Sequence, residues 1–166
     1  MAGTRRRRLV RQPCQHHGFR HRGIHQGTGW RPGMSQTVDT ARLFDHSRFA
    51  ELLNALLDLL DDQAPEAGID AQLLCLQQHL QGQFAAEEEA MLATAFPATA
   101  AHKKHHDHAL DKLAQRIAQW QQGHDRKVLQ DYLENELAEW FVSHVNVRDF
   151  VTAQHLSLPR QDANPS

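Results

Sequence analysis

Histidine is the residue type that stands out in this chain, with thirteen among 166 residues. His102 and His106 are four residues apart, so on a helix their imidazoles project from one face and can bind the same ion. Gln83 and Glu87 have the same spacing. Imidazole and carboxylate side chains are common transition-metal ligands in proteins. The enrichment and the spacing together predict a metal-binding protein.

Two more histidines, His46 and His144, lie in line with the apolar residues of other segments. A single histidine in such a position is usually an ordinary core residue, but a buried carboxylate is costly unless it is paired, protonated or bound to a metal. Asp149 follows His144 by five residues, which places it about 140° further around an ideal helix. It reaches the same centre if it bridges to a second ion or if the helix loosens there. Two bridging carboxylates with imidazoles suit two iron ions.

The other histidines differ in their expected surroundings. His105 and His108 are predicted to face solvent, because they lie at the edge of the apolar stripe or off it. His79, one turn before Gln83, is a candidate neighbour of the centre that does not bind the metal. Four histidines near the N-terminus have no predicted helix to organise them; these are His16, His17, His21 and His25.

Four segments with helical periodicity position these residues. They run from Val38 to Asp62, from Ile69 to just before Phe96, from Pro97 to Gly123, and from Asp125 past Val151. The apolar stripe of the fourth segment contains Leu133, Leu137, Trp140, His144, Val147 and Val151. No strand-like alternation is present. Short connections between helices of similar length favour antiparallel neighbours. The predicted fold is all-α, an up-down-up-down antiparallel four-helix bundle.

Charge divides the chain into unequal parts. Residues 1–33 contain eight arginines and no acidic residue, whereas residues 34–166 contain ten Lys or Arg against twenty Asp or Glu, a balance of −10. We therefore predict a disordered basic arm over residues 1–36, a bundle over 37–154 and a frayed tail over 155–166. Three interpretations of the arm are open: a targeting peptide, an arm that binds nucleic acid or an anionic surface, or an extension upstream of a natural start at Met34.

Composition also narrows the class of protein. No stretch approaches the 18 apolar residues of a membrane-spanning helix, so no membrane partner is expected. The acidic bundle is a poor match for nucleic acid. No apolar segment follows Arg5 and Arg6, which argues against export and favours a cytoplasmic location. Two cysteines are too few for a disulfide scaffold.

Four stretches of the chain, in order and with similar spacing, resemble the motifs of the bacterial hemerythrins. Residues 46–56 (HSRFAELLNAL) are similar to H-K-x-L-F-x-L-I-N-x-L, and residues 83–91 (QFAAEEEAM) to H-F-x-x-E-E-x-x-M. Residues 96–107 contain FP followed by HKKHHD, similar to Y-P-x-x-x-x-H-x-x-x-H-x. Residues 140–149 (WFVSHVNVRD) are similar to W-L-x-x-H-I-x-x-x-D. The resemblance covers about residues 40–151.

The resemblance implies a non-haem centre of two iron ions with an oxo or hydroxo bridge. One iron would be held by His102, His106 and His144, and the other by His46 and the residue at position 83. The carboxylates that bridge the two would be Glu87 and Asp149. Members of the family bind O2 reversibly at the less-coordinated iron. We therefore expect a non-enzymatic protein of oxygen storage, delivery or sensing, with O2 as its partner. The expected walls of the O2 pocket are Trp140, Phe141, Leu53, Leu80 and Leu113.

One departure from the family pattern keeps other functions open. Gln83 stands where the family has a histidine, and it either binds iron through its amide oxygen or leaves a position to water. An open position would suit a di-iron enzyme acting on peroxide or nitric oxide. A third hypothesis is a regulatory bundle that carries little metal, which would need a separate protein partner because no output domain is recognisable.

Overall fold

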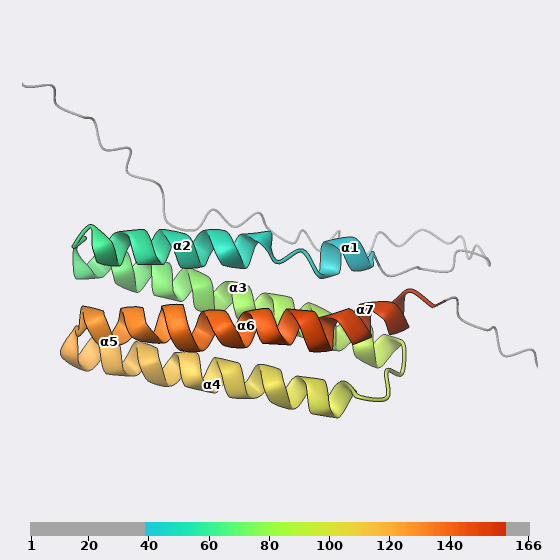
Figure 1. The fold of residues 1–166 in the computed structure, drawn as a ribbon. Helices are drawn as coiled ribbons and strands as arrows, with labels where there is room; N and C mark the ends of the chain where they lie inside the picture. Colours follow the sequence, from blue (N-terminus) through green and yellow to red (C-terminus); the bar gives the residue numbers. More distant parts are fainter. Residues whose placement is uncertain (1–38, 159–166) are drawn as a thin grey trace, which may run out of the picture.

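The computed structural model describes residues 39–158, so the predicted basic arm and most of the predicted tail lie outside the described residues. The described chain is helical and contains no strand (Figure 1). The first three rods of the structure are made of α1 (Thr40–Leu43) with α2 (Ser47–Asp61), α3 (Glu66–Ala93) and α4 (Thr99–Gly123). The last rod is continuous and consists of α5 (Arg126–Asp131), η1 (Tyr132–Leu137), α6 (Ala138–His144), η2 (Val145–Asp149) and α7 (Phe150–Leu156), where η marks a π-helical turn.

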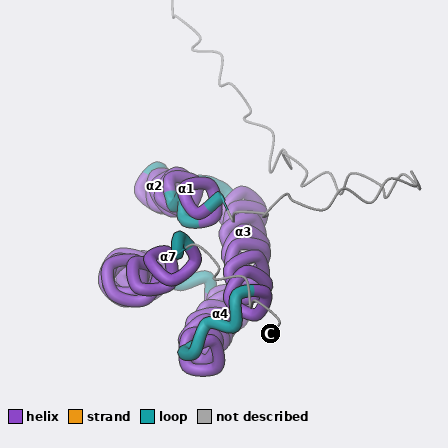
Figure 2. Tube along the Cα trace, turned by 90° about the vertical axis from the view of Figure 1, so that its right-hand side faces the viewer, coloured by secondary structure: helices purple, strands orange, loops and turns teal. Residues whose placement is uncertain are grey.

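The rods pack side by side as a helical bundle. Seen along its length, α3 lies between α2 and α4, and the last rod lies on the opposite side, beside both (Figure 2). The turns that follow α2 and α4 lie at one end of the bundle, and the loop between α3 and α4 lies at the other (Figure 1). The interior is filled by large apolar side chains from every rod, including Leu56, Leu60, Ile69, Leu73, Leu76, Leu80, Leu113, Leu133 and Leu137. Among the helices of residues 39–158, none has the length and apolar character needed to cross a bilayer.

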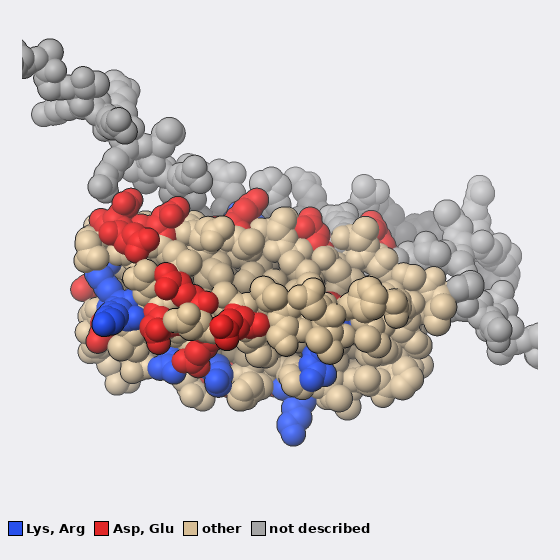
Figure 3. Space-filling model, viewed as in Figure 1, with Lys and Arg blue, Asp and Glu red and all other residues tan. Residues whose placement is uncertain are grey.

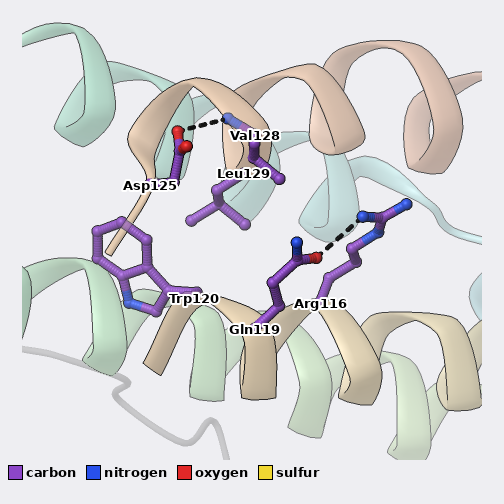
Figure 4. Close-up of a pocket in the computed structure, with 6 residues that line it drawn as sticks. All are labelled: Arg116, Gln119, Trp120, Asp125, Val128 and Leu129. Atoms are coloured by element: carbon purple, nitrogen blue, oxygen red, sulfur yellow. Dashed lines mark hydrogen bonds between the residues drawn. The ribbon is translucent and has the colours of Figure 1, made fainter. Parts of the chain in front are cut away.

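The turn between α4 and α5 shows how local sequence ends and restarts a helix. His124 takes a left-handed conformation with φ of 48°, which terminates α4 directly after Gly123. Asp125 then caps α5, accepting a 3.1 Å hydrogen bond from the backbone N–H of Val128 (Figure 4). Trp120 and Leu129 line a small pocket beside this cap. These contacts fix the point at which the last rod starts.

The first predicted helix is wrong in one respect, because it is broken rather than continuous. Residues Phe44 to His46 separate α1 from α2. The Asp45 carboxylate accepts a 3.1 Å hydrogen bond from the backbone N–H of Ser47, a local bond that competes with helical hydrogen bonding. His46 therefore occupies the position just before α2, with φ of −91° and ψ of 5°.

The apolar stripe predicted for the last rod is wrong beyond His144. Val147 and Val151 were expected in the core but are 60% and 51% exposed. The reason is η2, in which the backbone N–H of Phe150 donates to the carbonyl of Val145, five residues earlier. A π-turn adds one residue to a helical turn, so every later residue changes face. The buried positions after His144 are Asp149, Thr152 and Leu156.

Candidate metal centre

Three imidazoles from two rods converge inside the bundle. His102 and His106 lie one turn apart on α4, and His144 lies at the end of α6. The Nε2 atom of His144 is 3.0 Å from Nε2 of His102 and 3.1 Å from Nε2 of His106. All three side chains are buried. The predicted i, i+4 pair on α4 therefore meets the predicted histidine of the last rod.

The hydrogen-bond partners of the Nδ1 atoms of His102 and His106 indicate that Nδ1 carries the proton in both rings. The Thr152 hydroxyl donates to the carbonyl of Arg148 at 2.9 Å, so at 3.0 Å it accepts from Nδ1–H of His102. The Glu88 carboxylate, 3.1 Å from Nδ1 of His106, can only accept when ionised. The Nε2 atoms of His102 and His106 then carry no proton, and their lone pairs point toward the same place in the core. Such an arrangement suits a cation, since histidine ligands in metal sites usually donate their other N–H to an oxygen in this way.

Two buried carboxylates complete this group of ligands. Asp149 Oδ1 lies 3.1 Å from Nε2 of His144 and 3.2 Å from Nε2 of His102, and Glu87 Oε2 lies 3.3 Å from Nε2 of His106. Five donor atoms, one from each residue, lie within 4.8 Å of one another. Both Asp149 oxygens and Glu87 Oε2 are buried without a hydrogen-bond partner in the described part of the chain. Buried oxygens of this kind are expensive unless a cation satisfies them, so the residues fit a metal.

The second oxygen of each carboxylate faces a different neighbour. Asp149 Oδ2 lies 3.3 Å from Nε2 of His46, and Glu87 Oε1 lies 3.1 Å from Nε2 of Gln83. Each carboxylate thus presents one oxygen to the three-histidine side and the other to the side of His46. The break between α1 and α2 places the His46 ring there, at the start of the first long helix.

Gln83 contacts two of the predicted ligands through its amide nitrogen. This nitrogen is 2.8 Å from Nδ1 of His46 and 3.1 Å from Oε1 of Glu87, with the carbonyl of Leu43 at 3.5 Å. The Leu43 carbonyl and Glu87 Oε1 accept from this nitrogen, and the role of His46 Nδ1 follows from which of its ring nitrogens carries the proton. An amide N–H is not a metal ligand, so a ligand role for the Gln83 oxygen stays a prediction. His79 Nε2 is buried and makes no hydrogen bond to any described residue.

The two carboxylates have opposite electrostatic surroundings. Burial raises the pKa of Glu87 to about 8, and the nearby Asp149 carboxylate acts in the same direction. For Asp149 burial also acts upwards, but the imidazoles of His102, His144 and His46 outweigh it and hold its pKa well below the usual range. Burial lowers the pKa of His106 and His144. At neutral pH, the metal-free centre therefore holds a proton on Glu87 that a bound cation must displace.

Aromatic rings cover the imidazoles. Phe84 stacks on His106 with ring centroids 3.9 Å apart, and Trp140 stacks on His144 at 4.7 Å. Phe141 meets His46 edge-on at 5.2 Å. Trp140 and Phe141, which were predicted as walls of an O2 pocket, thus contact the histidines, and their role as pocket walls stays a prediction. The other predicted walls are buried in the hydrophobic core cluster; these are Leu53, Leu80 and Leu113.

Sequence reasoning missed three residues that support the ligands. Thr152 and Glu88 hold the Nδ1 edges of His102 and His106, and Phe84 covers a ring face. The signal for Glu88 was its place directly after Glu87, and Phe84 lies three residues before Glu87 on the same helix. The signal for Thr152 was weaker, because only the π-turn brings it to the buried face. Two histidines were predicted to face solvent. Of these, His108 is exposed, whereas His105 is partly buried.

The chain is similar to known proteins over most of its length. The family model described as "Hemerythrin HHE cation binding domain" matches residues 43–156. A bacteriohemerythrin of Ralstonia nicotianae is 31% identical over 128 residues, which are 75% of this chain and 86% of that protein. A bacteriohemerythrin of Aquifex aeolicus is 31% identical over 114 residues, which are 67% of this chain and 84% of that protein. No solved structure matches the chain. The match spans the whole ligand set from His46 to Asp149, and the chain belongs to the family of hemerythrin HHE cation-binding domains.

Proposed function

We propose that this chain is a non-enzymatic O2-binding protein that binds O2 reversibly at a carboxylate-bridged centre of two iron ions, for oxygen storage, delivery or sensing. The observation that supports it best is the placement of the carboxylate oxygens. Asp149 and Glu87 each direct one oxygen to the three histidines and the other to the side of His46 and Gln83. This is the arrangement that two bridged ions require.

The proposed ligand sets follow from these contacts. One iron would be held by His102, His106 and His144 and the other by His46, and Glu87 and Asp149 would supply carboxylate oxygens to both. The rods then form the antiparallel up-down-up-down four-helix bundle predicted from the sequence. A cytoplasmic location and the lack of nucleic-acid and membrane partners stay predictions of the sequence.

When bound, two ferrous ions would supply the electrons that reversible O2 binding needs. The chain's own contribution is to hold the ions and to keep water away from them. Trp140, Phe141 and Phe84 cover the imidazoles, and a dry site protects bound species against side reactions with water. Thr152 and Glu88 accept the Nδ1 protons of His102 and His106, which keeps the Nε2 lone pairs directed at the metal.

One observation favours a second candidate function, a di-iron enzyme that acts on peroxide or nitric oxide. On the His46 side the chain offers His46 Nε2, Asp149 Oδ2 and Glu87 Oε1, while Gln83 presents its N–H groups. The three-histidine side offers five donor atoms. An ion on the poorer side has positions for a small substrate. The metal-poor regulatory hypothesis is less favoured, because it leaves the buried oxygens of Asp149 and Glu87 without partners.

The test is iron analysis and optical spectroscopy of the purified full chain. We expect close to two irons per chain, or fewer if the His46 side loses its ion, and an air-exposed spectrum that reverts under vacuum and returns with O2. The variant His102→Ala should lose iron, while His105→Ala, on the same helix but outside the cluster, should keep it. Turnover of peroxide or nitric oxide without a reversible oxygenated form would favour the enzyme. A protein that holds only zinc, or no metal after anaerobic reconstitution with ferrous iron, would contradict both.

A further inference from the structure

The outer face of the last rod exposes large apolar side chains. Along it we define the outer strip as five residues that are 51–65% exposed: Val142, Val147, Phe150, Val151 and Leu158. Because of the turn η2, Asp149 and Thr152 lie on the buried face of this rod, while Val147 and Val151 lie on its exposed face. The strip therefore lies on the side of the rod that faces away from the metal centre.

The strip also contains no Lys, Arg, Asp or Glu side chain. From Val142 to Leu158 the charged residues are Asp149, which is buried, and Arg148, which is partly buried. In Figure 3 acidic side chains cover the end of the bundle formed by α2, α3 and α5 and continue along the start of the last rod. The front face over η2 and α7 carries none of them. Two copies of a bundle whose charge balance is −10 over residues 34–166 would repel across the acidic surface, but not across this strip.

The size of the strip fits an interface between two copies. Its five side chains expose about 500 Å², at the upper end of the apolar patches of ordinary monomers. Two such strips facing each other would remove about 1,000 Å² from water, which is the lower limit for a specific protein interface. Neighbouring uncharged side chains such as Asn146 and Gln154 add to this area at the edges.

We propose that the outer strip is the interface through which two copies of this chain form a dimer. Phe150 lies midway, eight residues from both Val142 and Leu158. When two last rods cross in antiparallel directions, Val142 of one copy meets Leu158 of the other, and Phe150 meets its own copy near the two-fold axis. An apolar strip with this symmetry is complementary to itself, as an isologous interface requires. The two metal centres then lie back to back on opposite sides of the paired rods.

The experiment is sedimentation of the full chain from about 1 µM to about 1 mM, the range in which weak and moderate dimers dissociate. We expect a monomer–dimer equilibrium within this range. The variants Phe150→Glu and Phe150→Lys each place like charges together at the axis and should weaken the dimer about 100-fold or more. An equal mixture of the two variants should recover at least about tenfold, because opposite charges then meet. The matched controls are Leu74→Glu and Leu74→Lys, which alter a 52% exposed leucine on α3 and should leave the equilibrium unchanged.

The remaining outcomes would overturn the proposal. A wild-type chain that stays monomeric throughout the range would show that the strip does not pair with itself. A dimer that both Phe150 variants leave intact would place the interface elsewhere. Loss of the dimer in each variant without recovery in the mixture would exclude the two-fold contact at Phe150. Helix content and bound iron, measured on each variant, show that it is folded, and neither depends on the dimer.

Discussion

The imidazole of His144 and the carboxylate of Asp149 meet with 3.1 Å between Nε2 and Oδ1, although Asp149 is five positions further along the chain. In an α-helix this spacing turns the second side chain about 140° away from the first. The π-turn η2 lies between them and brings both to the buried face. The one extra residue in this helical turn thus brings Asp149, the second predicted ligand of the last rod, to the same face as His144.

Changes of length at η2 should therefore act in opposite ways. Deleting Asn146 brings the two ligands to a spacing of i, i+4, which an ordinary α-helix places about 40° apart, so we expect the iron content to be kept. Inserting one alanine after Asn146 should turn Asp149 away and remove iron from the centre. Iron per chain, measured beside helix content, checks both variants. Equal iron contents in the two would mean that the π-turn does not position Asp149.

The variant Gln83→His should strengthen the weaker side of the centre. It replaces an amide that contacts His46 and Glu87 by an imidazole, which is a better iron ligand. Even groups that only touch ligands alter metal affinity about 10- to 100-fold, so we expect at least this gain for the second iron. Iron content during a chelator challenge measures it, and Gln81→His, at an exposed position two residues away, is the control. Tighter binding by the wild type would show that glutamine itself is a ligand.

Removing the Thr152 hydroxyl should weaken the three-histidine side. Thr152→Val keeps the shape of the side chain but removes the acceptor for Nδ1–H of His102. We expect metal affinity to fall about 10- to 100-fold while the fold is kept. Thr94→Val, which alters a hydroxyl bonded to helix carbonyls, serves as the control. Competition with a chromophoric chelator gives the metal affinities. If the two variants have equal affinities, the Thr152 hydroxyl does not contribute to metal binding.

Metal uptake should depend on pH through Glu87. Its pKa is raised to about 8 in the metal-free protein, so below this value a proton must leave before the carboxylate binds a cation. Affinity should therefore rise with pH, by about fivefold between pH 7 and 8 from this group, and level off above pH 8. Burial lowers the pKa of His106 and His144, so neither adds a proton to displace in this range.

Calorimetry in buffers of different ionisation enthalpy measures the protons released. We expect about one proton to be released per site near pH 7. If no proton is released, Glu87 is already ionised in the metal-free protein. The control Glu89→Gln, which changes an exposed neighbour, should keep the pH dependence.

The contribution of Glu87 to the stability of the metal-free protein should fall as the pH rises. The pKa of Glu87 is higher in the folded chain than its ordinary value of 4.5, so between about 4.5 and 8 the folded state binds the extra proton. The contribution of this group to the free energy of unfolding is then largest below pH 4.5 and is lost as the pH approaches 8. Denaturant unfolding of metal-free Glu87→Gln, compared with the wild type, isolates this group. The prediction is wrong if the difference in free energy of unfolding between the wild type and Glu87→Gln stays the same from pH 4.5 to pH 8.

Much of the centre could be predicted from the sequence because its ligands interrupt apolar stripes. His102, His106 and Glu87 lie on regular α-helices, where a spacing of four residues is enough to place side chains on one face. The same reasoning was wrong for Val147 and Val151, since a fixed 100° per residue cannot include a π-turn. It allowed for Asp149 only by assuming a local loosening of the helix, which η2 provides.

Other features depend on contacts that no periodicity contains. The break at Phe44 to His46 follows from a single hydrogen bond from Ser47 N–H to Asp45. Thr152 is a ligand support only because residues 50 positions apart meet in the bundle. The direction of the Gln83 amide is set by His46 and Glu87 from two different rods.

The π-turn η2 also bears on the order in which the chain folds and takes up its metal. Tightening the backbone there to α-helical hydrogen bonding would rotate Asp149 by about 100° and take its oxygens out of the centre. A bound cation opposes that rotation, because it ties Asp149 to ligands on other rods. Amide hydrogens of residues 145–150 should therefore exchange faster with solvent in the metal-free chain than those of α3 and slow down once iron binds. If they do, metal uptake completes the folding of this stretch of helix.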